Sequence, residues 1–166
     1  MCQSCQLGKH VRLPFSSSQS SSTFPFELLH CDLWTSPIEC VSGFKYYLVI
    51  LDDFTHYVWT FPLRNKSDVH NIFLNFQRYV LVHFFLHIRF IQCDNDREFD
   101  NFKNWSFFLQ YGILLRFSCP YTSPQNGKAE RSLRTLNDII HTLLVQSSMP
   151  PKFWDEALHT ATYYSI

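Results

Sequence analysis

Apolar residues in the first half of the chain recur at the spacing of β-strands. Residues 27–34, 44–54 and 56–63 are rich in aromatic and β-branched side chains and are separated by short polar stretches. This pattern predicts three neighbouring strands. Connections this short favour an antiparallel meander.

From residue 67 onward the apolar spacing becomes helical. Ser67 is a suitable N-cap and Asp68 would lie in the first turn of the helix that follows. Its apolar stripe is formed by Val69, Ile72, Phe73, Phe76 and Val80. The same reasoning then predicts a strand at 87–94, a short helix at 102–111, a strand at 113–118, a long helix at 125–146 and a last helix after Pro150 and Pro151. The residues of the long helix expected to face inward are Ala129, Leu133, Leu136, Ile140 and Leu143.

This order of elements predicts an α/β fold, with a five-stranded mixed sheet and helices on both faces. The serine-rich stretch at 16–23 has the composition of a linker, so we expect a domain boundary near residue 24. The chain would then consist of a short basic segment at 1–15, the linker at 16–23 and a folded domain at 24–166.

The composition is that of a globular domain without a strong overall charge. Hydrophobic residues make up 46% of the chain and aromatic residues 17%, which is enough to fill a sizeable core. The phenylalanines expected in that core are Phe73, Phe76, Phe84, Phe85, Phe107 and Phe108. Fourteen basic residues balance fourteen acidic ones, so any binding of nucleic acid has to be local.

Neither a membrane span nor secretion is predicted. The longest strongly apolar run, 79–91, is too short for a bilayer and is interrupted by His83, His87 and Arg89. No signal peptide precedes Cys2. Six irregularly spaced cysteines predict reduced thiols and thus a nuclear or cytoplasmic protein. Four of them are expected to pack as small apolar side chains: Cys31, Cys40, Cys93 and Cys119.

Three acidic residues fall where such a fold could bring them together. Asp32 lies on the first predicted strand, Asp94 at the end of the fourth, and Glu130 in the first turn of the long helix. Clustered carboxylates hold Mg²⁺ or Mn²⁺, and such ions support phosphodiester chemistry. Each acid also has a structural alternative: Asp32 could end a strand, Asp94 could form an Asx-turn, and Glu130 could complement the helix dipole.

Other charged residues near these positions have two interpretations. Asp52 and Asp53 follow the second strand, and we expect them to accept turn hydrogen bonds. Lys128, Arg131 and Arg134 are candidates for contacts with DNA phosphates. The alternative is an ordinary solvated helix face with one ion pair between Glu130 and Arg134.

Several stretches of the sequence resemble one known family, the integrases of copia-type long-terminal-repeat retrotransposons. Thirty-five residues separate Asp94 from Glu130, which is the family's spacing. The matching stretches follow the family's order: CQSCQLGKHVRLPF, LLHCDLWTSP, YYLVILDDFTHYVWTFPLRNKSD, CDNDREFDN, SCPYTSPQNGKAERSLRTL and PPKFWDEALHTATYYSI.

The resemblance implies a ribonuclease H-like fold and a metal-binding triad of Asp32, Asp94 and Glu130. It implies trimming of the 3′ ends of a linear DNA copy, followed by attack of those ends on target DNA. It also implies assembly of two or more copies, and no small-molecule substrate. Gln125, Asn126 and Gly127 would form a loop ahead of the helix that contacts DNA, so Asn126 joins the predicted DNA-binding residues.

The sequence departs from the family pattern at two places. Asp96 and Arg97 replace two glycines, so we expect backbone strain if either position needs a positive φ, and a changed field at the metal site. Cys2 and Cys5 resemble the second half of a His-His-Cys-Cys zinc module. His10 lies on the wrong side of this pair, so a complete zinc site is not expected. We interpret the chain as a fragment of a polyprotein.

Two other functions remain open from the sequence. The chain could be a retrotransposon remnant that folds, does no chemistry and at most binds nucleic acid weakly. A ribonuclease acting on RNA–DNA hybrids would use the same metal chemistry, but the residues around Glu130 resemble integrases.

Overall fold

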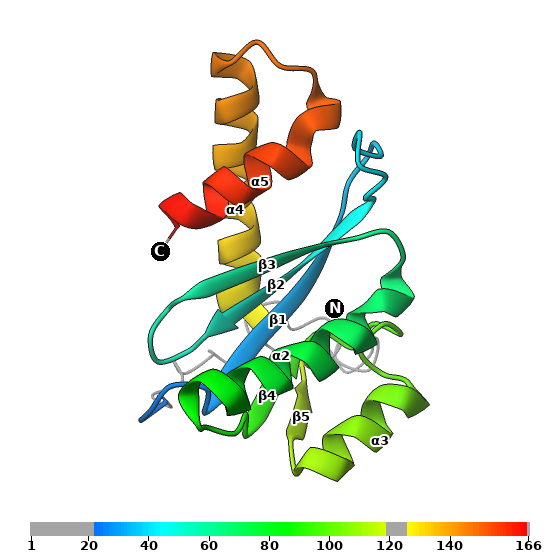
Figure 1. The fold of residues 1–166 in the computed structure, drawn as a ribbon, viewed down its shortest axis with the longest axis vertical. Helices are drawn as coiled ribbons and strands as arrows, with labels where there is room; N and C mark the ends of the chain where they lie inside the picture. Colours follow the sequence, from blue (N-terminus) through cyan, green and yellow to red (C-terminus); the bar gives the residue numbers. More distant parts are fainter. Residues whose placement is uncertain (1–21, 119–125, 166) are drawn as a thin grey trace, which may run out of the picture.

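A computed structural model describes residues 22–118 and 126–165 of the chain (Figure 1). The strands are β1 (Leu28–Thr35), β2 (Tyr46–Asp52), β3 (Val58–Leu63), β4 (Phe90–Cys93) and β5 (Leu114–Phe117). The α-helices are α2 (Val69–Phe84), α3 (Phe102–Tyr111), α4 (Gly127–Gln146) and α5 (Trp154–Tyr164). Two short 3₁₀ helices, η1 (Lys66–Asp68) and η3 (Pro151–Phe153), lead into α2 and α5.

The five strands form one mixed sheet in the order β3-β2-β1-β4-β5. β1, β2 and β3 are antiparallel neighbours, whereas β4 and β5 run parallel to β1. The predicted meander and the predicted mixed sheet are therefore both confirmed. Helix α2 connects β3 to β4, and α3 connects β4 to β5, because parallel strands need crossover connections.

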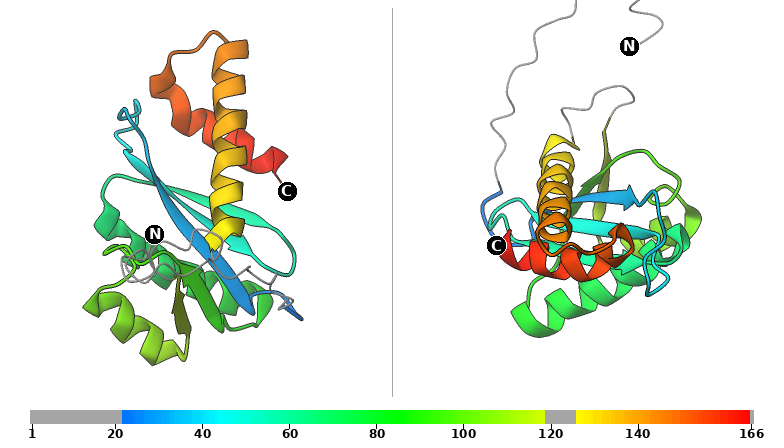
Figure 2. Two further views of the ribbon diagram at one scale, coloured as in Figure 1. Left: turned by 180° about the vertical axis from the view of Figure 1, so that it is seen from behind. Right: turned by 90° about the horizontal axis from the view of Figure 1, so that it is seen from above.

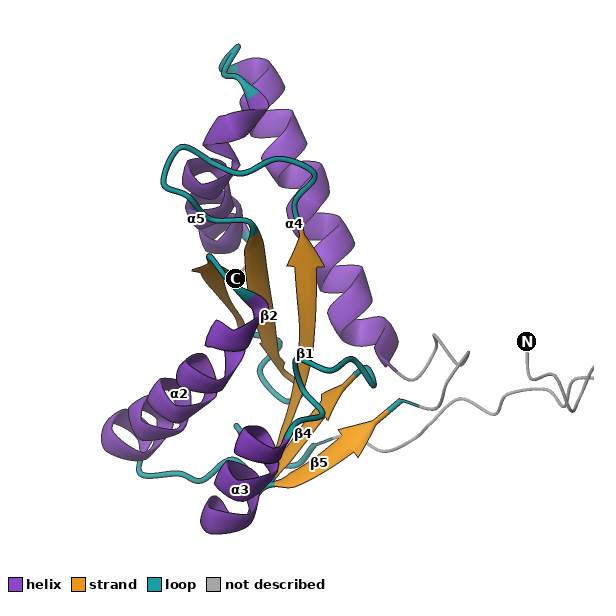
Figure 3. Ribbon diagram, turned by 90° about the vertical axis from the view of Figure 1, so that its right-hand side faces the viewer, coloured by secondary structure: helices purple, strands orange, loops and turns teal. Residues whose placement is uncertain are grey.

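Successive residues of β1 point to opposite faces of the sheet and into two different cores. Leu29 and Cys31 belong to the core that lies under α2 and α3. Trp34 packs against the second core, between the sheet and helices α4 and α5. Figure 3 shows α4 on the opposite side of β1 from α2 and α3, and Figure 2 shows α5 crossing α4.

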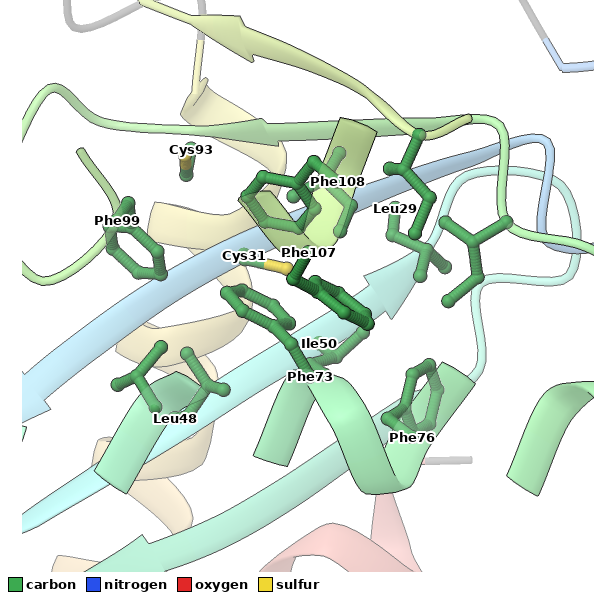
Figure 4. Packing of buried hydrophobic residues seen from close by; sticks show 14 of the residues in the cluster. Leu29, Cys31, Leu48, Ile50, Phe73, Phe76, Cys93, Phe99, Phe107 and Phe108 are labelled. Atoms are coloured by element: carbon green, nitrogen blue, oxygen red, sulfur yellow. The ribbon is translucent and has the colours of Figure 1, made fainter. Parts of the chain in front are cut away.

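Aromatic side chains fill the first core (Figure 4). Phe73 of α2 lies with its ring centroid 5.5 Å from that of Phe108 and 6.2 Å from that of Phe99. Cys31 and Cys93 are fully buried in the same core, and Cys40 is buried in the second, as predicted for small apolar side chains. Cys119 lies outside the described residues.

Several helix details differ from the predictions. Ser67 lies inside η1, and Asp68 is the residue that precedes α2. Ile72 and Leu143 are only partly buried and pack against the edges of the two cores, whereas Leu144, which was not predicted to face inward, is buried. Phe84 and Phe85 are exposed and not buried in the core, because α2 ends at Phe84 and Phe85 adopts the left-handed conformation that ends the helix.

None of the helices within the described part of the chain is long and apolar enough to cross a membrane.

Replacing Phe73 by alanine should lower the free energy of unfolding by about 3–5 kcal/mol, because the cavity left in a packed aromatic core cannot collapse.

Phe85, at the end of α2, is 84% exposed with a φ of 57°. Its replacement by glycine should therefore cost nothing and can add up to about 1 kcal/mol, since glycine adopts this conformation without strain. Chemical denaturation measures both; equal losses would contradict the assignment of the core.

Candidate active site

The register between β1 and β4 brings Asp32 and Asp94 together. Leu28 pairs with Phe90, and His30 pairs with Gln92. The same register, carried two positions further, places Asp32 of β1 beside Asp94, which follows the last residue of β4. Each aspartate directly follows a cysteine, Cys31 or Cys93, whose side chain faces the first core. The two carboxylates therefore lie on the opposite face of the sheet, which α4 covers.

Helix α4 brings Glu130 to the same place. Its N-cap, Asn126, is buried, and the side-chain amide of Asn126 donates a hydrogen bond to the backbone oxygen of Cys31 at 3.3 Å. Further along, the Tyr47 hydroxyl of β2 donates to the Asn137 side chain at 3.1 Å. The bond from Asn126 attaches the start of α4, whose first turn contains Glu130, to the strand residue that precedes Asp32, and the bond from Tyr47 attaches the middle of α4 to β2.

The charges of these acids act on one another. The pKa of Asp32 is raised from 3.8 to about 7, first by burial and then by the negative charges of Asp94, Glu130 and Asp96, against a hydrogen bond from the Leu33 amide. That amide donates to Asp32 at 2.9 Å. The pKa of Asp94 rises to about 6, again through burial first and then through the charge of Asp96. The three predicted acids therefore form one electrostatic cluster.

The chemistry of this cluster fits a hard divalent cation. Its donors are carboxylate oxygens, which are partly buried and repel one another. A divalent cation bound between them would neutralise this charge. Across residues 22–118 and 126–165, no three His, Cys, Asp or Glu side chains lie close enough together to hold an ion as they stand. The donor set is thus suitable, whereas the side-chain positions are not those of a closed ligand shell.

The loop after β4 does not carry the strain that its sequence suggested. Neither Asp96 nor Arg97 has a positive φ, so the loss of two glycines has no backbone cost here. The condition under which strain was expected is therefore not met. The Asp96 amide donates weakly to the Asp94 carboxylate at 3.4 Å, in the predicted Asx-turn. Lys66 and Glu98 form an ion pair at 2.8 Å that holds this loop to the start of α2.

Asp52 has the structural role that the sequence predicted. Its carboxylate accepts hydrogen bonds from the Phe26 amide at 2.9 Å, the Thr55 amide at 3.0 Å and the Thr55 hydroxyl at 2.7 Å. The bonds from Thr55 close the turn between β2 and β3, and the bond from Phe26 ties the segment before β1 to the end of β2.

Asp53 has partners that the sequence did not reveal. His30 donates from Nε2 to its carboxylate at 2.8 Å, and the Lys128 ammonium pairs with the same oxygen. Burial lowers the pKa of His30 despite the neighbouring carboxylate, so the imidazole is neutral at pH 7. The only available signal was the position of His30 two residues before Asp32, which places both side chains on the same sheet face.

The predicted DNA-binding residues have different surroundings. Arg131 and Arg134 are exposed on α4, as a phosphate contact requires, whereas Lys128 is bound to Asp53. Asn126 is buried, and Asn126 and Gly127 begin the helix instead of forming a loop ahead of it. Gln125 lies outside the described residues. DNA contacts by Asn126, Lys128, Arg131 and Arg134 stay predictions.

A cavity of about 330 Å³ lies beside α4, against the turn between β2 and β3 and the end of α5. Lys128, Arg131 and Tyr164 contribute to its lining, but none of the three acids does. The cavity is therefore separate from the carboxylate cluster. Cys2 and Cys5, the candidates for a partial zinc site, lie outside the described residues.

Sequence comparisons place the chain among integrases. The family model described as integrase core domain matches residues 22–123. The chain is 36% identical over 162 residues to the retrovirus-related Pol polyprotein from transposon RE1 of Arabidopsis thaliana, and 28% identical over 163 residues to that from transposon TNT 1-94 of Nicotiana tabacum. Each match covers 98% of this chain, but only 11% and 12% of the polyproteins.

Two solved structures have the same fold at low sequence identity. A chain of the simian T-cell lymphotropic virus intasome in complex with PP2A regulatory subunit B56 gamma has a TM-score of 0.74 at 16% identity, over 98% of this chain and 56% of that one. The HTLV-2 integrase catalytic core domain in complex with magnesium, in a trimeric form, has a TM-score of 0.61 at 18% identity, over 85% of each chain. The fold is therefore ribonuclease H-like, and the chain belongs to the integrase core domain family.

Proposed function

We propose that this chain is the catalytic core of a copia-type retrotransposon integrase and transfers polynucleotide ends onto DNA in a metal-dependent reaction. The observation that carries the proposal is the convergence of Asp32, Asp94 and Glu130 from three separate elements onto one face of the sheet. The reactions would be removal of terminal nucleotides from a DNA copy of the element and joining of its 3′ ends to target DNA.

Each part of the site would have a distinct task. Asp32, Asp94 and Glu130 would hold Mg²⁺ or Mn²⁺. When bound, such ions activate the attacking oxygen and stabilise the leaving one. Arg131 and Arg134, exposed on the same helix as Glu130, would neutralise DNA phosphates and so orient the strand relative to the three acids.

The relatives support an assembly as well. The solved HTLV-2 core is described in a trimeric form, and the simian viral protein as part of an intasome. We extend this to the present chain as a proposal: two DNA ends joined in concert require more than one copy.

A folded nucleic-acid-binding remnant without activity is the second candidate. The observation in its favour is Asp96, which adds a further negative charge beside Asp94 and Asp32 and makes ionisation of both harder. Metal titration and DNA joining distinguish the two candidates.

Calorimetric titration of the protein with Mg²⁺ or Mn²⁺ should show binding that is lost in Asp94→Asn, because the variant lacks one of three charged oxygen ligands. The variant should also fail to join a labelled DNA end to target DNA. Asp138→Asn makes the same charge change on an exposed part of α4 and should leave both readouts intact. Wild-type protein that neither binds these ions nor joins DNA would favour the remnant.

Asp32→Asn should make the ion-free protein more stable above pH 7. The pKa of Asp32 is raised from 3.8 to about 7 in the folded state, so the folded protein holds a proton that the unfolded chain releases. The contribution of this carboxyl group to the free energy of unfolding is therefore fully present below about pH 4 and is lost as the pH rises towards 7. At pH 8 the variant should gain on the order of 1–3 kcal/mol over wild type, and at pH 4 almost nothing.

Thermal unfolding at both pH values, with and without Mg²⁺, measures this effect. The ion should stabilise wild type at pH 8 but not Asp32→Asn, which reverses their order if the ion binds tightly. A variant that loses stability at pH 8 without ions would refute the repulsion between these acids.

Arg131→Gln and Arg134→Gln should each weaken DNA binding to a similar extent on any sequence. Each should also reduce the slope of log K against log salt by about 0.9, since one phosphate contact is lost. Fluorescence anisotropy over a series of salt concentrations gives the slope. An unchanged slope in both variants would show that this helix face is merely solvated.

A further inference from the structure

The carboxylate of Asp53 joins three segments of the chain that are distant in sequence. Its side chain is 2% exposed, at the turn that follows β2. It accepts hydrogen bonds from the Ser22 amide at 3.1 Å and the Ser22 hydroxyl at 3.0 Å. The His30 imidazole of β1 and the Lys128 ammonium of α4 provide the other two donors. A buried carboxylate needs several donors to offset its desolvation, and Asp53 has four.

Lys128 has an unusual place for a cation. It lies in the first turn of α4, where the helix dipole is positive and disfavours a positive side chain. The carboxylate of Asp53 removes this conflict, because it neutralises the ammonium and itself lies near the positive end of the helix. Glu130 lies two residues further along the same turn, so a displacement of the helix backbone at Lys128 also displaces Glu130.

His30 provides the matching connection to the other acids. It lies on β1 two residues before Asp32, and both side chains are on the α4 face of the sheet. Its Nε2 is bound to Asp53, while its Nδ1 is buried without a hydrogen-bond partner among the described residues. Asp53 is thus the only polar contact we find for the imidazole in that part of the chain.

We propose that Asp53 is a positioning residue, which fixes the first turn of α4 against β1 and thereby sets Glu130 relative to Asp32 and Asp94. The proposal rests on the proposed function, because it assigns Asp53 to the arrangement of those three acids. Asp53 itself does not touch metal or DNA; it acts through Lys128 and His30.

Two charge-removing variants distinguish positioning from a simple electrostatic effect. Lys128→Met removes a cation near the acids, so electrostatics alone would strengthen Mg²⁺ binding. Positioning predicts the opposite: Lys128→Met and Asp53→Asn should each weaken Mg²⁺ binding about tenfold, in the range of lost supporting contacts around a metal site. Titration without DNA excludes any effect of Lys128 on DNA contacts.

Coupling between the two residues provides the next readout. The double variant should bind Mg²⁺ no more weakly than either single variant, because both changes break one ion pair. Lys128→Arg keeps the charge and should recover most of the affinity lost in Lys128→Met. Asp138→Asn, an exposed carboxylate on the same helix, is the control for the loss of one negative charge and should bind Mg²⁺ like wild type.

Hydrogen exchange in the absence of metal tests the positioning itself. The amides of residues 130–134 should exchange about tenfold faster in Asp53→Asn and Lys128→Met than in wild type, while amides in the second half of α4 stay unchanged. If Asp53→Asn does not fold, Lys128→Met decides alone, since the Lys128 side chain is 44% exposed and its loss leaves no cavity.

Each outcome has a defined meaning. Faster exchange at 130–134 together with weaker, non-additive Mg²⁺ binding supports the proposal. Unchanged exchange overturns it, as does tighter Mg²⁺ binding by Lys128→Met. If wild type binds no Mg²⁺ at all, the proposed function fails, and the exchange result alone decides whether Asp53 fixes this turn.

Discussion

The alternation of side chains along β1 is the constraint on which the whole site depends. One set of residues, which includes Leu29 and Cys31, packs in the aromatic core under α2 and α3. The residues between them, His30 and Asp32, must therefore face α4. A shift of one residue in the register would bury Asp32 among phenylalanines, so the packing of the core determines where the acid points.

The same strand explains why the acids meet although they repel each other. Neighbouring strands hold Asp32 and Asp94 side by side through backbone hydrogen bonds, and the buried contacts of α4 hold Glu130 near them. The energy of the two cores thus offsets the electrostatic cost of concentrating negative charge in one place. Such local conflict, supported by a stable frame, is typical of functional sites.

Much of this architecture followed from the sequence because it depends on local periodicity. All five strands and the α-helices were predicted near their observed places, and the spacing of the three acids indicated a common site. Phe84 and Phe85 were assigned to the core wrongly, since periodicity does not reveal at which residue a helix ends. Strain at Asp96 and Arg97 was expected only if either position needed a positive φ, and the sequence could not show that the loop avoids this conformation.

The cluster around Asp53 could not be predicted for a different reason. Its members come from four separate parts of the chain, and each residue alone has an ordinary explanation. Asp53 resembles a turn residue, His30 has no metal-ligand spacing, and Lys128 resembles a surface cation. Only the three-dimensional arrangement shows that they share one carboxylate.

The two bonds from Ser22 to Asp53 have a practical consequence for the limits of the folded unit. The composition suggested that the domain starts at residue 24, after the serine-rich stretch. A recombinant version trimmed to that point would lose half of the donors that solvate the Asp53 carboxylate. Ser22, within the serine tract, therefore belongs to the folded domain. The shortest version of the domain that keeps both bonds to Asp53 begins no later than Ser22.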